Sequence, residues 1–146
     1  MRRYYKITLL LLMLASCVCN MQAQDKKRQW TKEMLEYKHD FIVKETGMTQ
    51  AQRDKFMPLY EAMEKEIYNV NHNAREQAKK INASNNVSDD EYAKAAKTMA
   101  EVKSKEGEIE TRYFNQFAKI LSKKQLFLLK QAEIKFYRQM TEKKKK

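Results

Sequence analysis

The stretch that decides the fold is Gly47-Met-Thr-Gln-Ala-Gln-Arg-Asp-Lys-Phe-Met-Pro-Leu-Tyr60. Glycine is the residue that most readily ends a helix in the left-handed conformation, so one helix is predicted to end at Gly47. Thr49 and Gln52 have the spacing of a capping box. In such a box the threonine oxygen accepts from the Gln52 amide, and the Gln52 side chain reaches back to the Thr49 amide. The next helix is therefore predicted to start at this point.

The same device occurs twice more in the chain. Leu121, Ser122 and Gln125 repeat the order of apolar residue, hydroxyl cap and reaching amide. Ser88 and Glu91 form a third box, in which the acidic first turn also complements the helix dipole. Each box predicts the first turn of a helix.

Apolar residues recur at helical spacing in four segments, at about 29–46, 50–82, 89–119 and 123–141. The chain has only two glycines and one proline, and 34% of its residues are charged. This composition is typical of long helices and disfavours a sandwich or barrel. We therefore predict a single all-α domain of four helices.

The two middle segments each carry a near-heptad apolar seam, which predicts a long antiparallel hairpin. The seam of segment 50–82 consists of Phe56, Tyr60, Met63, Ile67, Val70, Ala74, Ala78 and Ile81. The seam of segment 89–119 consists of Tyr92, Ala95, Met99, Val102, Ile109, Tyr113 and Phe117. Pro58 lies inside the first of these helices and predicts a bend there, because proline lacks an amide donor.

The last helix is apolar on two faces. One stripe consists of Leu126, Leu129, Phe136 and Met140, and the other consists of Phe127, Ile134 and Tyr137. A helix of this kind is either deeply buried or touches something beyond its own domain. A thin hairpin cannot bury every stripe, so a partner is expected, and a homodimer is one form of it.

Beyond residue 24, the net positive charge of the chain lies at this last helix and the tail that follows it. Residues 25–118 contain 17 basic and 17 acidic side chains, whereas residues 119–146 contain 10 basic and 2 acidic ones. This excess favours contact with anionic lipid head groups or with acidic unfolded chains. The candidate residues for binding such an unfolded chain, here called a client, are the second stripe together with four cations, namely Phe127, Ile134, Tyr137, Lys123, Lys124, Lys130 and Lys135. Residues 143–146 are predicted to be a solvated basic tail.

The first 23 residues are predicted to be an export signal, with a basic start and an apolar run at 7–15 that is too short for a comfortable membrane span. Two cleavage modes are open. A lipobox ending at Ser16 would leave an acylated Cys17, whereas ordinary cleavage after Ala23 would leave a chain without a lipid. An uncleaved anchor is a third alternative. All three place the helical domain, residues 24–142, outside the cytoplasm, and export argues against nucleic acid as a partner.

The sequence contains no pattern for a nucleotide, a metal or a covalent catalyst. Glycine-rich phosphate loops and C-x-x-C pairs are absent, and both cysteines lie before residue 20. His39 and His72 each lack a second histidine or cysteine at ligand spacing. Capping explains the hydroxyls of Thr49 and Ser122. We therefore expect no metal, no cofactor and no enzymatic activity.

The segments Met48-Thr49-x-x-Gln52 and Leu121-Ser122-x-x-Gln125 resemble the paired LTxxQ motifs of the Spy/CpxP family of periplasmic proteins. Methionine replaces leucine in the first copy and serine replaces threonine in the second, and both replacements keep the chemistry. The resemblance covers about residues 30–140. It implies a thin, curved homodimer with a concave binding face, located in the periplasm.

The resemblance also implies three functions. The first is an ATP-independent chaperone that binds unfolded or aggregation-prone clients. The second is an envelope-stress or sensor-regulating module with one specific protein partner. The third, a metal-binding stress protein, ranks last because the chain has only His39 and His72. Suppression of aggregation for several unrelated proteins would separate the first function from the second.

Overall fold

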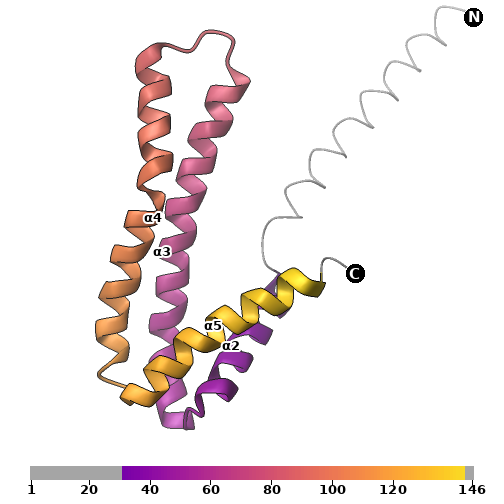
Figure 1. Ribbon diagram of the computed structural model, residues 1–146, viewed down its shortest axis with the longest axis vertical. Coiled ribbons are helices and arrows are strands. Elements are labelled where there is room, and N and C mark those ends of the chain that lie inside the picture. The colour runs from indigo at the N-terminus through magenta and orange to yellow at the C-terminus, as the bar shows by residue number, and fades with distance from the viewer. Residues whose placement is uncertain (1–30, 144–146) are drawn as a thin grey trace, which may run out of the picture. The chain divides into compact units, whose positions relative to one another are not determined.

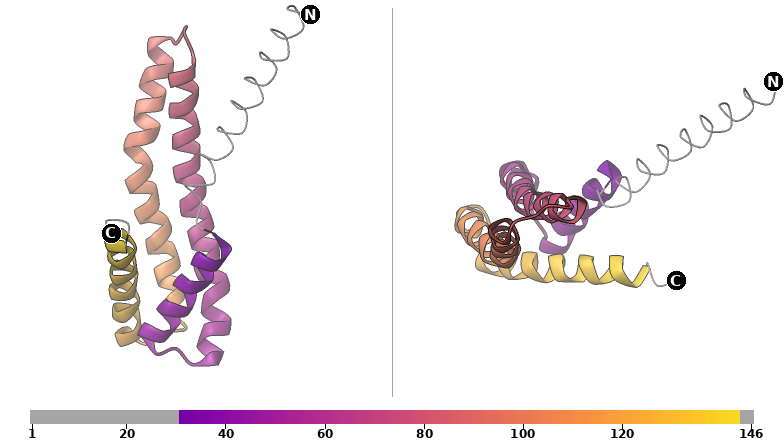
Figure 2. Two further views of the ribbon diagram at one scale, coloured as in Figure 1. Left: turned by 90° about the vertical axis from the view of Figure 1, so that its right-hand side faces the viewer. Right: turned by 90° about the horizontal axis from the view of Figure 1, so that it is seen from above.

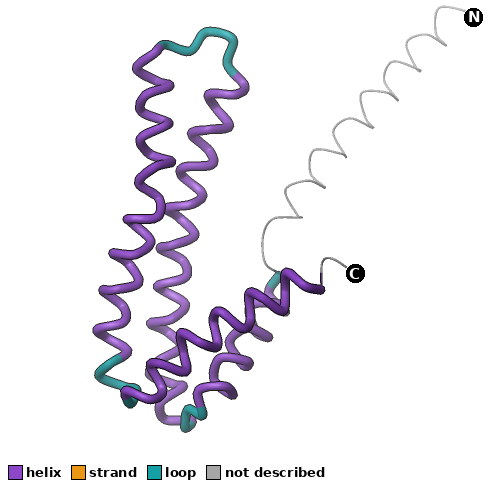
Figure 3. Tube along the Cα trace, in the orientation of Figure 1, coloured by secondary structure: helices purple, strands orange, loops and turns teal. Residues whose placement is uncertain are grey.

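The computed structural model describes residues 31–143, and all of its regular structure is helical within that range (Figure 3). The helices are α2 (Lys32–Thr46), α3 (Gln50–Ala83), α4 (Asp89–Phe117) and α5 (Lys123–Lys143). The predicted all-α class and the four segments are confirmed. The chain divides into two compact units, and the second, which begins at His39, holds the structure discussed below.

Helices α3 and α4 form the predicted long antiparallel hairpin and lie side by side in each view (Figures 1 and 2). Polar contacts join the helices at two points along the hairpin. Glu66 accepts a 2.6 Å hydrogen bond from the Tyr113 hydroxyl and pairs with the Arg112 guanidinium. Further along the hairpin, the Asn71 amide donates to the Glu106 carboxylate. These contacts fix how the two helices are aligned.

Helix α3 continues through Pro58, as predicted, and ends only at Ala83. The seam residues that are most buried lie on matching stretches of the two helices. On α3 they are Phe56, Tyr60, Met63 and Ala74, and on α4 they are Ala95, Ile109, Tyr113 and Phe117. The predicted seams therefore identify most of the contact between α3 and α4.

The prediction is wrong for two of the seam residues, because Tyr92 and Met99 are 52% and 55% exposed. They lie near the loop end of the hairpin, where the contacts of α4 are with α3. A helix packed on one neighbour buries a narrow stripe, and here that stripe contains Ala95 and Val102. Tyr92 and Met99 lie beside it and face solvent.

The core lies at the opposite end of the hairpin, where α5 and the last residues of α2 join α3 and α4. Helix α5 crosses the hairpin there (Figure 1). Phe56 packs on Phe117 with ring centroids 4.7 Å apart, and Phe136 packs on Phe41 at 5.6 Å. The buried cluster consists of Ile42, Phe56, Tyr60, Met63, Ile109, Tyr113, Phe117, Leu121, Leu126, Leu129 and Ala132. Complete burial of each large side chain contributes roughly 1.5–3 kcal/mol, so this end holds most of the hydrophobic stabilisation.

The predicted export signal at 1–23, including Cys17, lies outside the described residues, and so do residues 144–146 of the predicted tail. Among the helices that the structure describes, none combines the length and apolar character needed to cross a membrane.

Candidate functional site

Each LTxxQ-like motif caps its helix through the predicted pair of hydrogen bonds. The hydroxyl of Thr49 accepts from the Gln52 backbone amide at 3.2 Å, and Gln52 Oε1 accepts from the Thr49 amide at 3.1 Å. The corresponding bonds of Ser122 and Gln125 measure 3.2 and 3.0 Å. Both helix starts are therefore fixed by their own sequence.

The two motif glutamines also bind each other. Gln52 Nε2 donates to Gln125 Oε1 at 3.0 Å, and Gln125 Nε2 donates to Gln52 Oε1 at 3.0 Å. Each Nε2 makes one more bond, to the carbonyl two residues before the other motif's cap. These bonds go to Ile120 at 3.1 Å and to Gly47 at 3.4 Å. The two motif copies are thus related by an approximate local two-fold symmetry.

Capping determines how the two amides are oriented. Each Oε1 faces the backbone amide that it caps, so each Nε2 is left to donate across to the other motif. The paired motifs consequently tie the start of α3 to the start of α5, although Gln52 and Gln125 are 73 residues apart. Leu121 is buried and Met48 packs against the core. All these contacts are internal, which makes the motif a structural clamp.

Gly47 provides the turn that brings the first motif into this position. Its φ of +61° lies in the left-handed region, as predicted for a helix C-cap. The amides of Gly47 and Met48 donate to the carbonyls of Lys44 and Val43, which closes the end of α2. A side chain at position 47 would strain the backbone.

The third capping box starts α4 at the other end of the hairpin. Ser88 Oγ accepts from the Glu91 amide at 3.3 Å, and a Glu91 carboxylate oxygen accepts from the Ser88 amide at 2.9 Å. The hydrogen bond from the Ser88 backbone, followed by that from its hydroxyl, lowers the pKa of Glu91. Within the described residues this box is not joined to a second one.

The predicted second stripe of α5 is exposed. Phe127, Ile134 and Tyr137 are 63%, 68% and 51% accessible, whereas Leu129 and Phe136 on the other stripe are buried. We call the exposed stripe, together with the cations beside it, the outer face of α5. Large apolar side chains at helical spacing on one exposed face make this face the candidate interaction surface.

The four predicted client-binding lysines divide into two pairs. Lys130 and Lys135 are bound within the fold, to Glu133 at 2.7 Å and to Glu45 at 2.7 Å. Lys123 and Lys124 are exposed and have no ion pair within the part of the chain that the structure describes. The sequence interpretation missed Arg138, an exposed cation between Ile134 and the helix end; its spacing from Ile134 was the available signal.

Lys130 belongs to a polar network that the sequence did not reveal. Its ammonium also contacts Glu110 at 3.1 Å, and Glu133 accepts a 3.0 Å hydrogen bond from the Tyr60 hydroxyl. Burial raises the pKa of Tyr60, and the nearby charges of Glu133 and Glu64 raise it further. Burial works to lower the pKa of Lys130, but its bonds to Glu133 and Glu110 outweigh this effect and raise it. The network stabilises the junction of α3, α4 and α5 and leaves Lys130 charged.

The two histidines occupy different settings. His39 Nε2 lies 2.8 Å from a Glu64 oxygen, and its Nδ1 lies 3.6 Å from Glu61. His72 stacks on Tyr68 with ring centroids 5.6 Å apart. No group of three or more His, Cys, Asp or Glu side chains suited to a metal ion occurs among the described residues.

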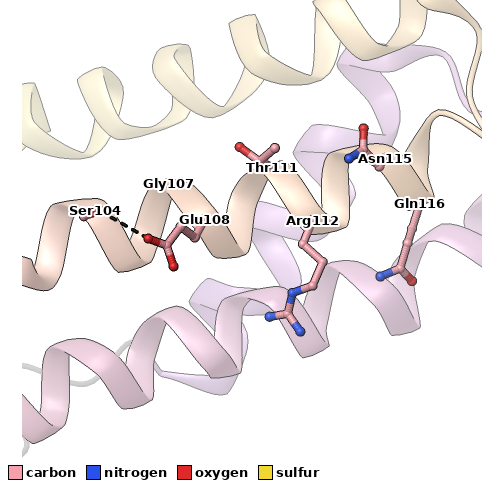
Figure 4. A pocket seen from close by; sticks show the side chains of 7 residues that line it. All are labelled: Ser104, Gly107, Glu108, Thr111, Arg112, Asn115 and Gln116. Atoms are coloured by element: carbon pink, nitrogen blue, oxygen red, sulfur yellow. Dashed lines mark hydrogen bonds between the residues drawn. The ribbon is translucent and has the colours of Figure 1, made fainter.

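A shallow pocket lies on one side of α4 and is lined mainly by residues with polar or charged side chains (Figure 4). Gly107 opens it by lacking a side chain, and Ser104 and Glu108 are joined by a 3.3 Å hydrogen bond at its edge. Arg112 points toward α3, where it pairs with Glu66 (Figure 4). The pocket residues come from a single helix and do not assemble a nucleophile with a base.

The structure thus gives the paired motifs an internal role and leaves the outer face of α5 as the candidate interaction site. The resemblance to the Spy/CpxP family remains a prediction based on the two motif copies. Comparison with protein-family models, with curated proteins and with solved structures finds no match to this chain.

Proposed function

We propose that this chain is an exported, ATP-independent chaperone-like protein that holds unfolded or aggregation-prone clients on the outer face of α5. The single observation that carries the proposal is the exposure of Phe127, Ile134 and Tyr137 along one face of an ordered helix. An unfolded chain exposes apolar groups, and these would lose contact with water against that face. The proposal assigns no catalytic step and no cofactor.

Charge supports the proposal. The excess of basic residues begins at residue 119, so α5 and the residues that flank it carry the net positive charge of an otherwise neutral domain. Lys123, Lys124 and Arg138 are exposed next to the apolar stripe. Long-range attraction would bring acidic client segments to α5, and apolar contact would then hold them. An anionic lipid surface would be attracted by the same cations.

We further propose that the chain acts in the periplasm as a homodimer, which is what the resemblance implies. Tyr92 and Met99 support this proposal, because they are exposed on a helix of the thin hairpin and a second copy would cover them. Sedimentation equilibrium of the exported domain should give twice the mass of one chain, and a single-chain mass at high micromolar concentration would contradict it.

An aggregation assay on the domain from Asp25 onward tests the proposed function. Three unrelated proteins, denatured separately, are diluted into buffer with and without the domain, and light scattering is recorded. The domain should reduce scattering for all three. The double substitution Phe127→Ser and Tyr137→Ser should remove most of this effect while circular dichroism shows the helices intact.

Tyr68→Ser is the matched control, because Tyr68 is also a partly exposed aromatic residue but lies on α3. It should leave the suppression unchanged. If the wild-type domain suppresses no protein of the three, the chaperone proposal is wrong, and a regulatory module with one specific partner becomes the better account. A domain that works only with anionic vesicles would favour a lipid surface instead.

A further inference from the structure

A groove between α4 and α5 lies next to the outer face of α5. Its floor is formed by Met63, Phe117 and Leu129, which are 5%, 2% and 1% exposed. Thr111 and Phe114 of α4 form one wall, and Phe114 is 39% exposed. The floor and the aromatic wall are apolar, so the groove would bind an apolar group.

The size of the groove fits one large side chain. Its volume is about 230 Å³. For comparison, an apolar cavity of about 150 Å³ in a protein core accommodates a benzene molecule. The groove is partly open to solvent, so a side chain of an extended chain that runs across the helices can enter it. A leucine, methionine or phenylalanine of a client matches both its shape and its polarity.

The rim of the groove has a net negative charge. It contains the carboxylates of Glu110 and Glu133 and the ammonium of Lys130, which contacts both. Glu133 is 12% exposed and is held by the Tyr60 hydroxyl as well. Glu110 is 47% exposed and can therefore reach a further cation from outside. The rim thus favours a positive neighbour over a negative one.

We propose that this groove takes one large apolar side chain of an extended client segment, and that Glu110 selects segments in which a Lys or Arg adjoins that side chain. The proposal rests on the proposed function, because it names a class of client segment. It differs from the outer face in its charge preference: the outer face attracts acidic segments, whereas the groove selects a basic neighbour. Lys130 belongs to the groove and is not one of the steering cations.

Fluorescent peptides test the groove directly. Three otherwise uncharged, unstructured 12-residue probes contain a central Leu-Lys, Leu-Glu or Ala-Lys pair, and their binding to the domain is measured by anisotropy. The Leu-Lys probe should bind about tenfold more tightly than the Ala-Lys probe, because only leucine fills the groove. It should also bind several-fold more tightly than the Leu-Glu probe, because of Glu110.

Two pairs of variants locate the binding. Thr111→Trp fills the groove and should lower the affinity for the Leu-Lys probe about tenfold. Ser104→Trp, on the same helix but outside the groove, should leave this affinity unchanged. Glu110→Gln should bring the affinities of the Leu-Lys and Leu-Glu probes together. Glu108→Gln, a charge change of the same kind on the same helix, should leave their ratio unchanged.

Equal affinity for all three probes overturns the proposal, and so does undiminished binding to the Thr111→Trp variant with its helices intact. Tighter binding of the Leu-Glu probe than of the Leu-Lys probe would show that Glu110 does not select a basic neighbour. The outcome is separable from that of the proposed function. Groove binding without any suppression of aggregation would refute only the chaperone role. Suppression that depends on Phe127 while the three probes bind equally would refute only the groove.

Discussion

Gln52 and Gln125 each have two structural roles, and only one of them could be predicted from the sequence. Capping depends on residues three apart, so the local spacing with Thr49 and Ser122 is sufficient to predict it. The amide pair forms between residues 73 apart, and each copy of the motif alone contains no sign of it. The only available signal was the repetition of the motif with the same residue types.

A double-mutant cycle measures this pairing. Gln52→Ala and Gln125→Ala should each lower the free energy of unfolding by about 1–3 kcal/mol, since each removes a cap and leaves the other glutamine without its partner. Because the residues are in contact, the double mutant should lose less than the sum, by at least about 0.5 kcal/mol. Urea titration provides the three values.

The control cycle combines Gln52→Ala with Glu91→Ala. Glu91 caps the start of α4, at the opposite end of the hairpin from Gln52. The effects of these two substitutions on the free energy of unfolding should therefore add within about 0.5 kcal/mol. Strict additivity of Gln52→Ala and Gln125→Ala would mean that the amide pair contributes nothing beyond the two caps.

Glu106 links stability to pH. Burial works to raise its pKa, but the hydrogen bonds from Asn71 and Lys103 outweigh burial, so the pKa lies below its ordinary value of 4.5. A carboxyl group with a lowered folded-state pKa stabilises the fold above its unfolded-state pKa, and this contribution is lost as the pH falls through the folded value. Acidification below about pH 4.5 should therefore weaken the hairpin.

The substitution Glu106→Gln tests this link, because glutamine can still accept from Asn71 but cannot titrate. The variant should be less stable than wild type at pH 7, and the difference should shrink as the pH falls below 4.5. Unfolding free energies at pH 7 and pH 3 measure it. Glu142→Gln, at the exposed end of α5, serves as the control. A difference that stays constant with pH would contradict the assignment.

At the scale of the helices, the sequence predicted where each element lies and which face of it is apolar. The predicted segment 50–82 became Gln50–Ala83, because the cap at Thr49 and the loop after it are local signals. The prediction that Tyr92 and Met99 are buried was wrong, because periodicity identifies an apolar face but not how many neighbouring helices cover it. The ion pairs of Lys130 with Glu110 and of Lys135 with Glu45 could not be predicted either, since they depend on how α5 crosses the other helices. The pair of Lys130 with Glu133 lies within α5 at a spacing of three residues, so the sequence did carry a signal for it.

These ion pairs divide the four candidate lysines into two pairs with different expected roles. Replacing Lys123 and Lys124 with Gln should slow the capture of an acidic client, as added salt does, and should change the free energy of unfolding by less than about 0.5 kcal/mol. Replacing Lys130 and Lys135 with Gln should instead lower that free energy by about 1–2 kcal/mol, because Glu133 and Glu45 lose their partners. Equal effects of the two double variants would show that the division is wrong.

At the scale of the whole molecule, net charge is distributed unevenly along the chain. A neutral segment at 25–118 precedes a basic segment at 119–146. The distribution of charge could be predicted from the sequence, but the sequence did not indicate which basic side chains remain available to bind a partner. The fold supplies that information, because it places acidic partners from α2, α4 and α5 beside two of the lysines.

The proposed export gives a prediction for the mature chain. The apolar run and both cleavage sites predict that residues 1–16 are absent from the protein made by its native host. Intact-mass measurement decides this. A mass that includes Met1 to Ser16 would contradict the prediction, and a lipid-modified Cys17 would select the lipobox over cleavage after Ala23.

The central claim is that the exposed apolar stripe of α5 holds clients, and its most direct test is the rate of client release. Stopped-flow fluorescence with an unfolded acidic client measures capture and release separately. Phe127→Ser combined with Tyr137→Ser should speed release about tenfold or more and change capture little, because apolar contact holds the client after charge has attracted it. Tyr68→Ser should change neither rate. Unchanged release from the double variant, with its helices intact by circular dichroism, would contradict the claim.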